Sequence, residues 1–271
     1  MIHIVTSANR ALYAAALAEM HRLRKVHFVD ERGWTAMTVR DGGEYDAYDD
    51  DQAVYLLAIE PNGAVSCSMR MRPAINGSIL ADVFPHLVAA DEAPLTAADT
   101  WEISRYFASS AARGKFGFKR RAEIRLAALE FALKQGAKRL IGMIDIEFLP
   151  PMLSGSGWRV RTLGLPAPYD EGVAQGIEVQ VSRGALVDFE DSQGLSAPLS
   201  IELDPASIPP LPPQEIEALL TVASSDDSSR QVMIKLIKRV VELEPTASED
   251  ELVGLIDYVC ALTERGEVVR N

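Results

Sequence analysis

Hydrophobic and polar positions along the chain predict a mixture of helices and strands. Apolar side chains recur at helical spacing over residues 9–26, behind Ser7 as an N-cap, and over 120–134, which Gly136 ends. The sequence Pro61-Asn62-Gly63 predicts a hairpin turn between the first two of five β-like runs. These runs are residues 53–59, 64–71, 101–107, 139–146 and 177–182.

The order of these elements indicates the fold class and the domains. Strands and helices alternate within residues 1–190, which predicts an α/β (α+β) fold with helices on the faces of a sheet. Four prolines in 208–213 predict a linker, placed at about 191–213. Three helical patterns, at about 214–223, 229–243 and 249–264, then predict a helical C-terminal extension over 214–271.

Charge separates the same two parts of the chain. Residues 1–190 carry 21 basic and 24 acidic side chains, a net charge of −3, whereas 191–271 carry 6 and 15, a net charge of −9. The total of −12 argues against a nucleic-acid binder and against a membrane-surface protein, since both need a basic face. Two cysteines exclude a disulfide framework. No apolar run approaches the roughly 18–20 residues that span a bilayer, and the N-terminus does not have the pattern of a signal peptide. We expect a cytoplasmic protein that binds neither nucleic acid nor membrane.

Charged and aromatic residues gather in three places. Arg22, Arg24, Phe28, Arg32 and Trp34 follow the first helix, and residues 44–49 alternate carboxylates with tyrosines. The third place is the strand around Glu102, where strict alternation puts Ser104 on the same face and Arg105 on the opposite one. Each could be a solvated surface or a structural ion pair. Because buried charges need partners, we expect Arg70 to join these carboxylates in one network.

A basic stretch leads into the second helix. It holds Arg113, Lys115, Lys119, Arg120, Arg121 and Arg125 against one acid. This suits a phosphate group at a helix N-terminus, although a solvated helix face is an equal alternative. We expect no metal site and no resident cofactor, because the sequence has no metal-ligand pattern, Walker loop, Rossmann glycines or nucleophile elbow.

The ordered set of these residues resembles the acyl-homoserine-lactone synthases, the LuxI-type autoinducer synthases, over about residues 1–185. Gly157-Trp158 and Leu163-Gly164 match the glycine–aromatic and leucine–glycine pairs that the family has later in its sequence. The other matching positions are Arg24, Phe28, Trp34, Asp46, Asp49, Arg70 before Pro73, Phe84, Glu102 and Arg105.

The resemblance implies a GNAT-like acyltransferase fold over residues 1–190, with a twisted mixed sheet. It also implies a reaction: the amine of S-adenosyl-methionine (SAM) attacks an acyl thioester, and the product closes to a lactone and releases methylthioadenosine, yielding a quorum-sensing signal. The expected catalytic residues are Glu102, as base, with Arg70, Asp46, Asp49 and Arg105. The expected substrate-binding residues are Arg24, Phe28, Trp34, Phe84, Ser104, Met143, Asp145 and Trp158. The expected phosphate-binding residues are Arg113, Lys115, Lys119 and Arg120.

Departures from the family pattern bear on the donor. Pro150, Pro151 and Gly155 stand where the family commonly has charged residues that help to dock an acyl-carrier protein. We therefore keep two candidate acyl donors, acyl-CoA and an acyl-carrier protein. Asp145, near Met143, stands where the family often has Thr, which argues against a 3-oxo-acyl preference. Alternatives are a GNAT-fold N-acyltransferase that makes an open-chain acyl amino acid and a non-catalytic ligand-binding protein. The C-terminal extension is a candidate homodimer contact.

Overall fold

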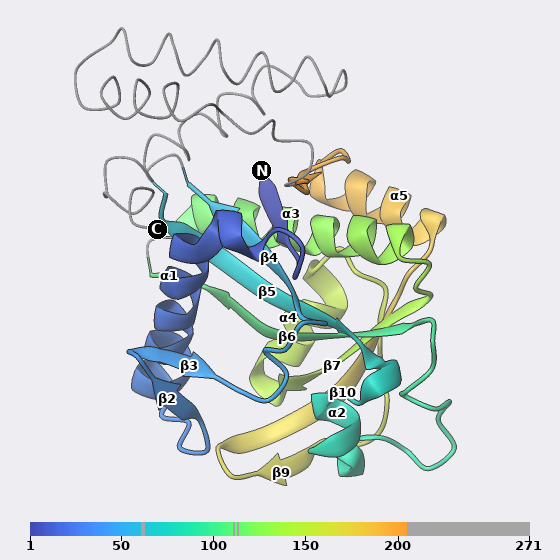
Figure 1. The fold of residues 1–271 in the computed structure, drawn as a ribbon. Helices are drawn as coiled ribbons and strands as arrows, with labels where there is room; N and C mark the ends of the chain where they lie inside the picture. The colour runs from blue at the N-terminus through green and yellow to red at the C-terminus, as the bar shows by residue number, and fades with distance from the viewer. Residues whose placement is uncertain (61–62, 111, 113, 205–271) are drawn as a thin grey trace, which may run out of the picture.

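A nine-stranded mixed sheet forms the centre of the protein (Figure 1). The structure is a computed structural model that describes residues 1–60, 63–110, 112 and 114–204. The strand order is β11-β1-β4-β5-β6-β7-β10-β8, with β9 paired to β10, and only the pairs β1–β11 and β6–β7 are parallel. The strands are β1 Ile2–Val5, β4 Val54–Ile59, β5 Val65–Pro73, β6 Thr100–Ala108, β7 Arg139–Asp145, β8 Val160–Thr162, β9 Ala167–Tyr169, β10 Gly172–Gln180 and β11 Ser200–Ile201.

Helices cover both faces of this sheet. Leu56 and Ala58 of β4 pack in a core cluster with α3 and α5, whereas Tyr55 and Leu57 pack with α1 on the other face. The helices are α1 Ala14–Arg24, α2 Ile79–Asp82, α3 Gly114–Lys134, α4 Leu149–Gly155 and α5 Arg183–Gln193. The single helical turns are η1 Arg10–Tyr13, η3 Ala74–Asn76, η4 Pro85–Leu87 and η5 Ile146–Phe148. A further helical segment, η2 Lys25–Glu31, extends α1. Outside the large sheet, β2 Thr38–Arg40 pairs with β3 Gly43–Tyr45. The predicted mixed sheet with flanking helices is confirmed.

The predicted boundaries change in three places. The second helix begins at Gly114 rather than at residue 120, so the basic stretch predicted to lead into it is helical from Gly114 on. The last predicted strand spans 172–180 rather than 177–182. The first predicted helix divides into η1, α1 and η2 and continues to Glu31. Helical periodicity finds the apolar face of a helix, but glycines and polar residues at its first turn hide where it begins.

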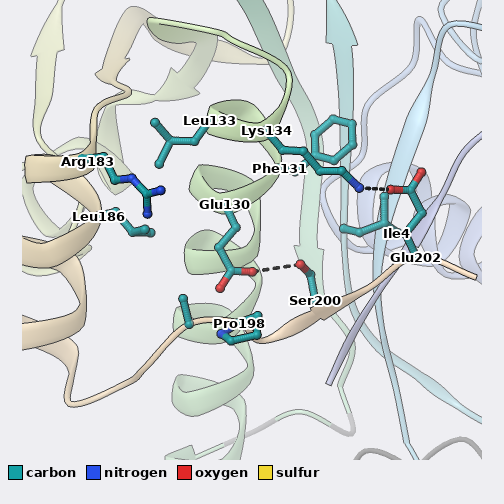
Figure 2. Close-up of a pocket in the computed structure, with 11 residues that line it drawn as sticks. Ile4, Glu130, Phe131, Leu133, Lys134, Arg183, Leu186, Pro198, Ser200 and Glu202 are labelled. Atoms are coloured by element: carbon teal, nitrogen blue, oxygen red, sulfur yellow. Dashed lines mark hydrogen bonds and ion pairs between the residues drawn. The ribbon is translucent and has the colours of Figure 1, made fainter. Parts of the chain in front are cut away.

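The folded domain continues past residue 190. Helix α5 ends at Gln193, and β11 adds a parallel strand beside β1. Figure 2 shows how α3 holds this segment: Glu130 accepts a hydrogen bond from the Ser200 hydroxyl (2.9 Å), and Lys134 pairs with Glu202 (2.7 Å). These residues line a pocket of about 580 Å³ between α3, α5 and β11. Residues 191–204 therefore belong to the sheet domain and not to a linker. The rest of the predicted linker and the three predicted C-terminal helices lie outside the described residues.

Strand β6 contains a bulge that alters which side chains share a face. Ser68 of β5 lies opposite Phe107, but Arg70, two residues on, lies opposite Ser104, three residues back, so β6 holds one extra residue. Arg105 sits in this bulge with a φ of 50°. The prediction that Arg105 faces away from Glu102 and Ser104 is therefore wrong, because a bulge breaks the two-residue period of a strand. Of the helices in the described part of the chain, none has the length and apolar character that a membrane span requires.

Candidate active site

Three arginines and three carboxylates form one buried ion network. Arg24 at the end of α1 contacts Glu44 (2.6 Å) and Asp49 (2.7 Å). Arg70 of β5 contacts Asp46 (2.6 Å) and Asp49 (2.8 Å). Arg105 closes the ring, with Glu44 at 3.0 Å and Asp46 at 2.6 Å. Equal numbers of opposite charges make the network neutral, which is the condition under which buried ions are tolerated.

Burial and ion pairing act in opposite directions on these groups. Burial raises the pKa of Asp46, but the hydrogen bonds and charge of Arg70 outweigh it, so the pKa lies below its ordinary value. The same balance with Arg24 lowers the pKa of Asp49. Both carboxylates are therefore charged at neutral pH and already occupied by guanidinium groups. The predicted network of Arg70 with the acidic loop is present, and Glu44 is a member that the sequence did not single out.

Glu102 differs from the other carboxylates. Among the described residues no ion pair reaches it; instead it accepts hydrogen bonds from the backbone amides of Ile79 (2.9 Å) and Leu80 (2.7 Å). Its side chain is buried, yet it lines the large cavity. Burial raises the pKa of Glu102, against the two amide bonds and the nearby charge of Arg70. A carboxylate with a raised pKa beside a cavity is suited to accept a proton from a bound amine.

The cavity has a volume of about 1020 Å³ and reaches both faces of the sheet. Strands β6 and β7 pair only over Thr100–Glu102 and Arg139–Ile141, so they diverge beyond. At the polar end lie Asp46, Glu102, Ser104 and Arg105; at the α3 end lie Ile103, Tyr106, Arg121, Arg125, Met152 and Trp158. The gap between β6 and β7 therefore joins a charged site to a mainly apolar one.

Aromatic rings line the polar end. Phe28 stacks on Trp34 (5.0 Å between centroids), and Tyr169 meets the edges of Trp34 (6.3 Å) and Phe84 (6.0 Å). The guanidinium of Arg105 lies over Phe28 at 5.6 Å. Such faces attract cationic ligands through the ring quadrupole. The sequence did not predict Tyr169, which lies beside Asp170 and Glu171 but in no motif that marks a site.

Asp145 lies at the end of β7 and also faces the cavity. Arg32 pairs with it, and the Tyr169 hydroxyl donates a hydrogen bond to it. The guanidinium of Arg32 also lies over Trp34 at 5.3 Å. The carboxylate of Asp145 is thus held by protein groups. Met143, two residues earlier on the same face of β7, contributes an apolar surface to the cavity.

The predicted phosphate-binding residues do not gather at the cavity. Arg113 lies outside the described residues, and Lys115 is exposed away from the cavity lining. Lys119 pairs with Glu123 (3.7 Å). Arg120 is bound by Glu60 (2.8 Å) and Glu123 (2.7 Å). Arg121 and Arg125, four residues apart on one face of α3, line the cavity instead.

Of the other predicted substrate-binding residues, all reach the cavity except Arg24, which is fully buried behind it. The hydroxyl of Ser104 accepts a hydrogen bond from Arg70 Nε (3.0 Å). Trp158 is buried at the α3 end, where its indole N–H donates to the backbone carbonyl of Arg125 (3.1 Å).

Comparisons with known proteins identify the family of this chain. The autoinducer synthase family model matches residues 8–186. An isovaleryl-homoserine lactone synthase of Bradyrhizobium diazoefficiens is 34% identical over 195 residues, which cover 72% of this chain and 86% of the relative. A solved CoA-dependent acyl-homoserine lactone synthase, with SAM and isopentyl-CoA, has a TM-score of 0.68 and 33% identity, covering 76% of this chain and 94% of that one.

A second solved CoA-dependent acyl-homoserine lactone synthase has a TM-score of 0.63 and 26% identity, covering 74% of this chain and 98% of that one. The family match spans more than half of the chain and includes every residue of the ion network and Glu102. The resemblance inferred from these residues is therefore confirmed. The chain belongs to the autoinducer synthase family, the acyltransferases that make acyl-homoserine-lactone signals.

Proposed function

We propose that this enzyme transfers the acyl group of an acyl-CoA to the amine of SAM and then closes the lactone. The observation that carries the proposal is the Glu102 carboxylate, which faces the cavity next to a neutral network and has no arginine partner in the described part of the chain. The surplus negative charge of ionised Glu102 favours the ammonium and sulfonium of SAM at the polar end. The stacked Phe28 and Trp34 provide aromatic faces for the sulfonium.

Glu102 acts as the base in this proposal. It takes a proton from the ammonium of SAM, directly or through water, and the free amine then attacks the thioester carbon. The amide bond forms as the carbon–sulfur bond to CoA breaks, and the thiolate takes up a proton. The carboxylate of the methionyl part next attacks its own γ-carbon, and the bond to the sulfonium breaks. The sulfur leaves as the neutral thioether methylthioadenosine.

The ion network positions this chemistry. Arg70 holds Asp46, Asp49 and Ser104 at once, so it sets the polar end around Glu102. Asp46 and Arg105 both face the cavity. Because their charges are mutually satisfied, we assign them to orienting the substrate rather than to proton transfer.

Helix α4 favours CoA over a carrier protein as the donor. Pro150 and Pro151 occupy its first turn, and Leu149–Gly155 contains no basic residue that could dock an acidic protein. The two solved relatives described above are named CoA-dependent. Arg121 beside the exposed ring of Phe118, 6.0 Å away, provides a cation at the α3 end for the phosphates of CoA.

The test is turnover with SAM and hexanoyl-CoA, followed as methylthioadenosine and lactone by mass spectrometry. Glu102→Gln should lower kcat by about 10²–10⁴-fold, as expected for loss of a general base. Glu19→Gln, which removes an exposed ion pair with Arg22, is the matched control. Activity in Glu102→Gln equal to the control would refute the role of Glu102. Thiol release without methylthioadenosine would indicate an open-chain acyl product instead.

Equal kcat/KM for hexanoyl-CoA and a hexanoyl carrier protein would refute the donor assignment. A cytoplasmic location, the absence of a resident cofactor and a dimer contact through the C-terminal extension stay predictions.

A further inference from the structure

Arg125 is a buried guanidinium with an incomplete set of partners. It is 7% exposed and lines the α3 end of the cavity. Its Nε donates to the backbone carbonyl of Ser156 (2.9 Å), and one terminal nitrogen donates to the Tyr106 hydroxyl (3.1 Å). Over the described ranges, no carboxylate forms an ion pair with Arg125. Since arginine carries five N–H donors and no acceptor, donors remain for a group in the cavity.

The neighbouring groups do not neutralise this charge. Ser156 caps the C-terminus of α4, so its carbonyl supplies only the partial negative charge of a helix end. The Tyr106 hydroxyl donates a hydrogen bond to the backbone carbonyl of Arg121 (3.3 Å). Burial raises the pKa of Tyr106, which keeps its hydroxyl neutral at physiological pH. The other buried arginines among the described residues differ from Arg125: Arg24 and Arg70 each face two carboxylates, and Arg72 pairs with Asp50.

The position of Arg125 separates it from the opening of the cavity. Phe118, earlier on α3, is 60% exposed, and Arg121 is half-buried beside it. Arg125 lies one turn further along the helix, against the buried indole of Trp158. Under the proposed function the thioester reacts near Glu102, and CoA leaves through the opening. The inner α3 end, with Ile103, Met152 and Trp158, then receives the acyl group.

We propose that Arg125 determines acyl specificity by binding an oxygen at the end of the acyl group remote from the thioester. This inference rests on the proposed function and deepens it by naming the class of donor. A purely alkyl group would leave a buried cation facing methyl groups, which is unfavourable. A terminal carboxylate or hydroxyl would instead accept a hydrogen bond from the guanidinium.

The experiment compares donors that differ only at the chain end. Hexanoyl-CoA, 6-hydroxyhexanoyl-CoA and adipoyl-CoA share six carbons and end in methyl, hydroxyl and carboxylate; the four- and eight-carbon series vary the reach. With SAM in excess, kcat/KM is measured from methylthioadenosine. At one chain length or more, the wild type should favour an oxygen-ended donor over the methyl-ended one by about tenfold or more, as for a charge-assisted hydrogen bond.

Variants at Arg125 separate charge from hydrogen bonding. Arg125→Met should abolish or reverse the preference. Arg125→Gln should retain a preference for the hydroxyl and lose that for the carboxylate. Arg159→Met, which removes an exposed ion pair with Asp188 outside the cavity, is the matched control and should leave the ranking of donors unchanged. Thermal unfolding of each variant shows whether it is folded. If Arg125→Met is not folded, the ranking of donors by the wild-type enzyme alone tests the inference.

Two outcomes would overturn the inference. One is a wild-type enzyme that favours the methyl-ended donor at every length. The other is an Arg125→Met variant in which all donors lose kcat/KM by one common factor, which would assign Arg125 to the phosphates of CoA or to the fold. The proposed function fails separately, if no donor yields methylthioadenosine. Turnover of hexanoyl-CoA without any preference for oxygen rejects the inference alone.

Discussion

Replacement of Glu44 by Gln tests whether the buried network stabilises the fold. Glu44 is fully buried and accepts hydrogen bonds from Arg24 (2.6 Å) and Arg105 (3.0 and 3.2 Å). The change leaves three guanidinium groups facing two carboxylates, a buried charge of +1, and points amide N–H groups at cations. Removing one partner of a buried ion pair costs about 3–5 kcal/mol of unfolding free energy. We expect Glu44→Gln to lose that amount.

The measurement is urea unfolding at pH 7.5, followed by tryptophan fluorescence. The three tryptophans, Trp34, Trp101 and Trp158, all lie in the sheet domain, so the signal reports that domain alone. Glu19→Gln breaks an exposed ion pair and should cost about 0–1 kcal/mol. Adding Arg105→Gln to Glu44→Gln restores neutrality, so the double variant should lose less than the sum of the single variants. A loss for Glu44→Gln no larger than for Glu19→Gln would refute the reasoning.

Three further predictions concern single contacts. Burial lowers the pKa of His21 to about 4, while the unfolded side chain titrates near 6.5, so the free energy of unfolding should fall by up to ~3 kcal/mol as pH falls from 6.5 to 4. The urea midpoint of His21→Phe should depend less on pH across this window than that of the wild type, and an equal dependence would contradict the prediction. A Cβ on Gly117 would lie 1.8 Å from the Ala112 carbonyl oxygen, so Gly117→Ala should lower Tm by several degrees. A Cβ on Gly184 would come no closer than 3.8 Å to a neighbouring atom, so Gly184→Ala should leave Tm unchanged; equal Tm values for the two variants would contradict the prediction. Arg32→Met removes the ion pair with Asp145 and the contact with Trp34, and should raise KM for SAM about tenfold with a smaller change in kcat. A fall in kcat with KM unchanged would exclude a role of Arg32 in binding SAM.

Several parts of the fold were predictable because they follow from local periodicity. The hairpin of β4 and β5, the strands β6 and β7 and the body of α3 appear where apolar runs and helical spacing predict them. The start of α3 was not predictable, since Gly114 and the basic residues after it have no helical apolar pattern. The pairing of β11 with β1 joins residues about 200 apart, and no local signal reports such a contact.

The candidate site shows the same division. The sequence by itself indicated that Arg70 pairs with the acidic loop, because buried charges must be paired within an otherwise apolar chain. It also placed Glu102 in that network, but the structure shows no ion pair to Glu102 among the described residues. Only the tertiary structure decided which carboxylates are occupied: Asp46 and Asp49 are held by arginines, and Glu102 by two backbone amides. It also decided that a bulge turns Arg105 into the network and that the phase of α3 brings Arg125 to the cavity. Periodicity specifies which side of an element is apolar, whereas bulges, helix starts and ion pairing depend on atoms brought together from distant parts of the chain.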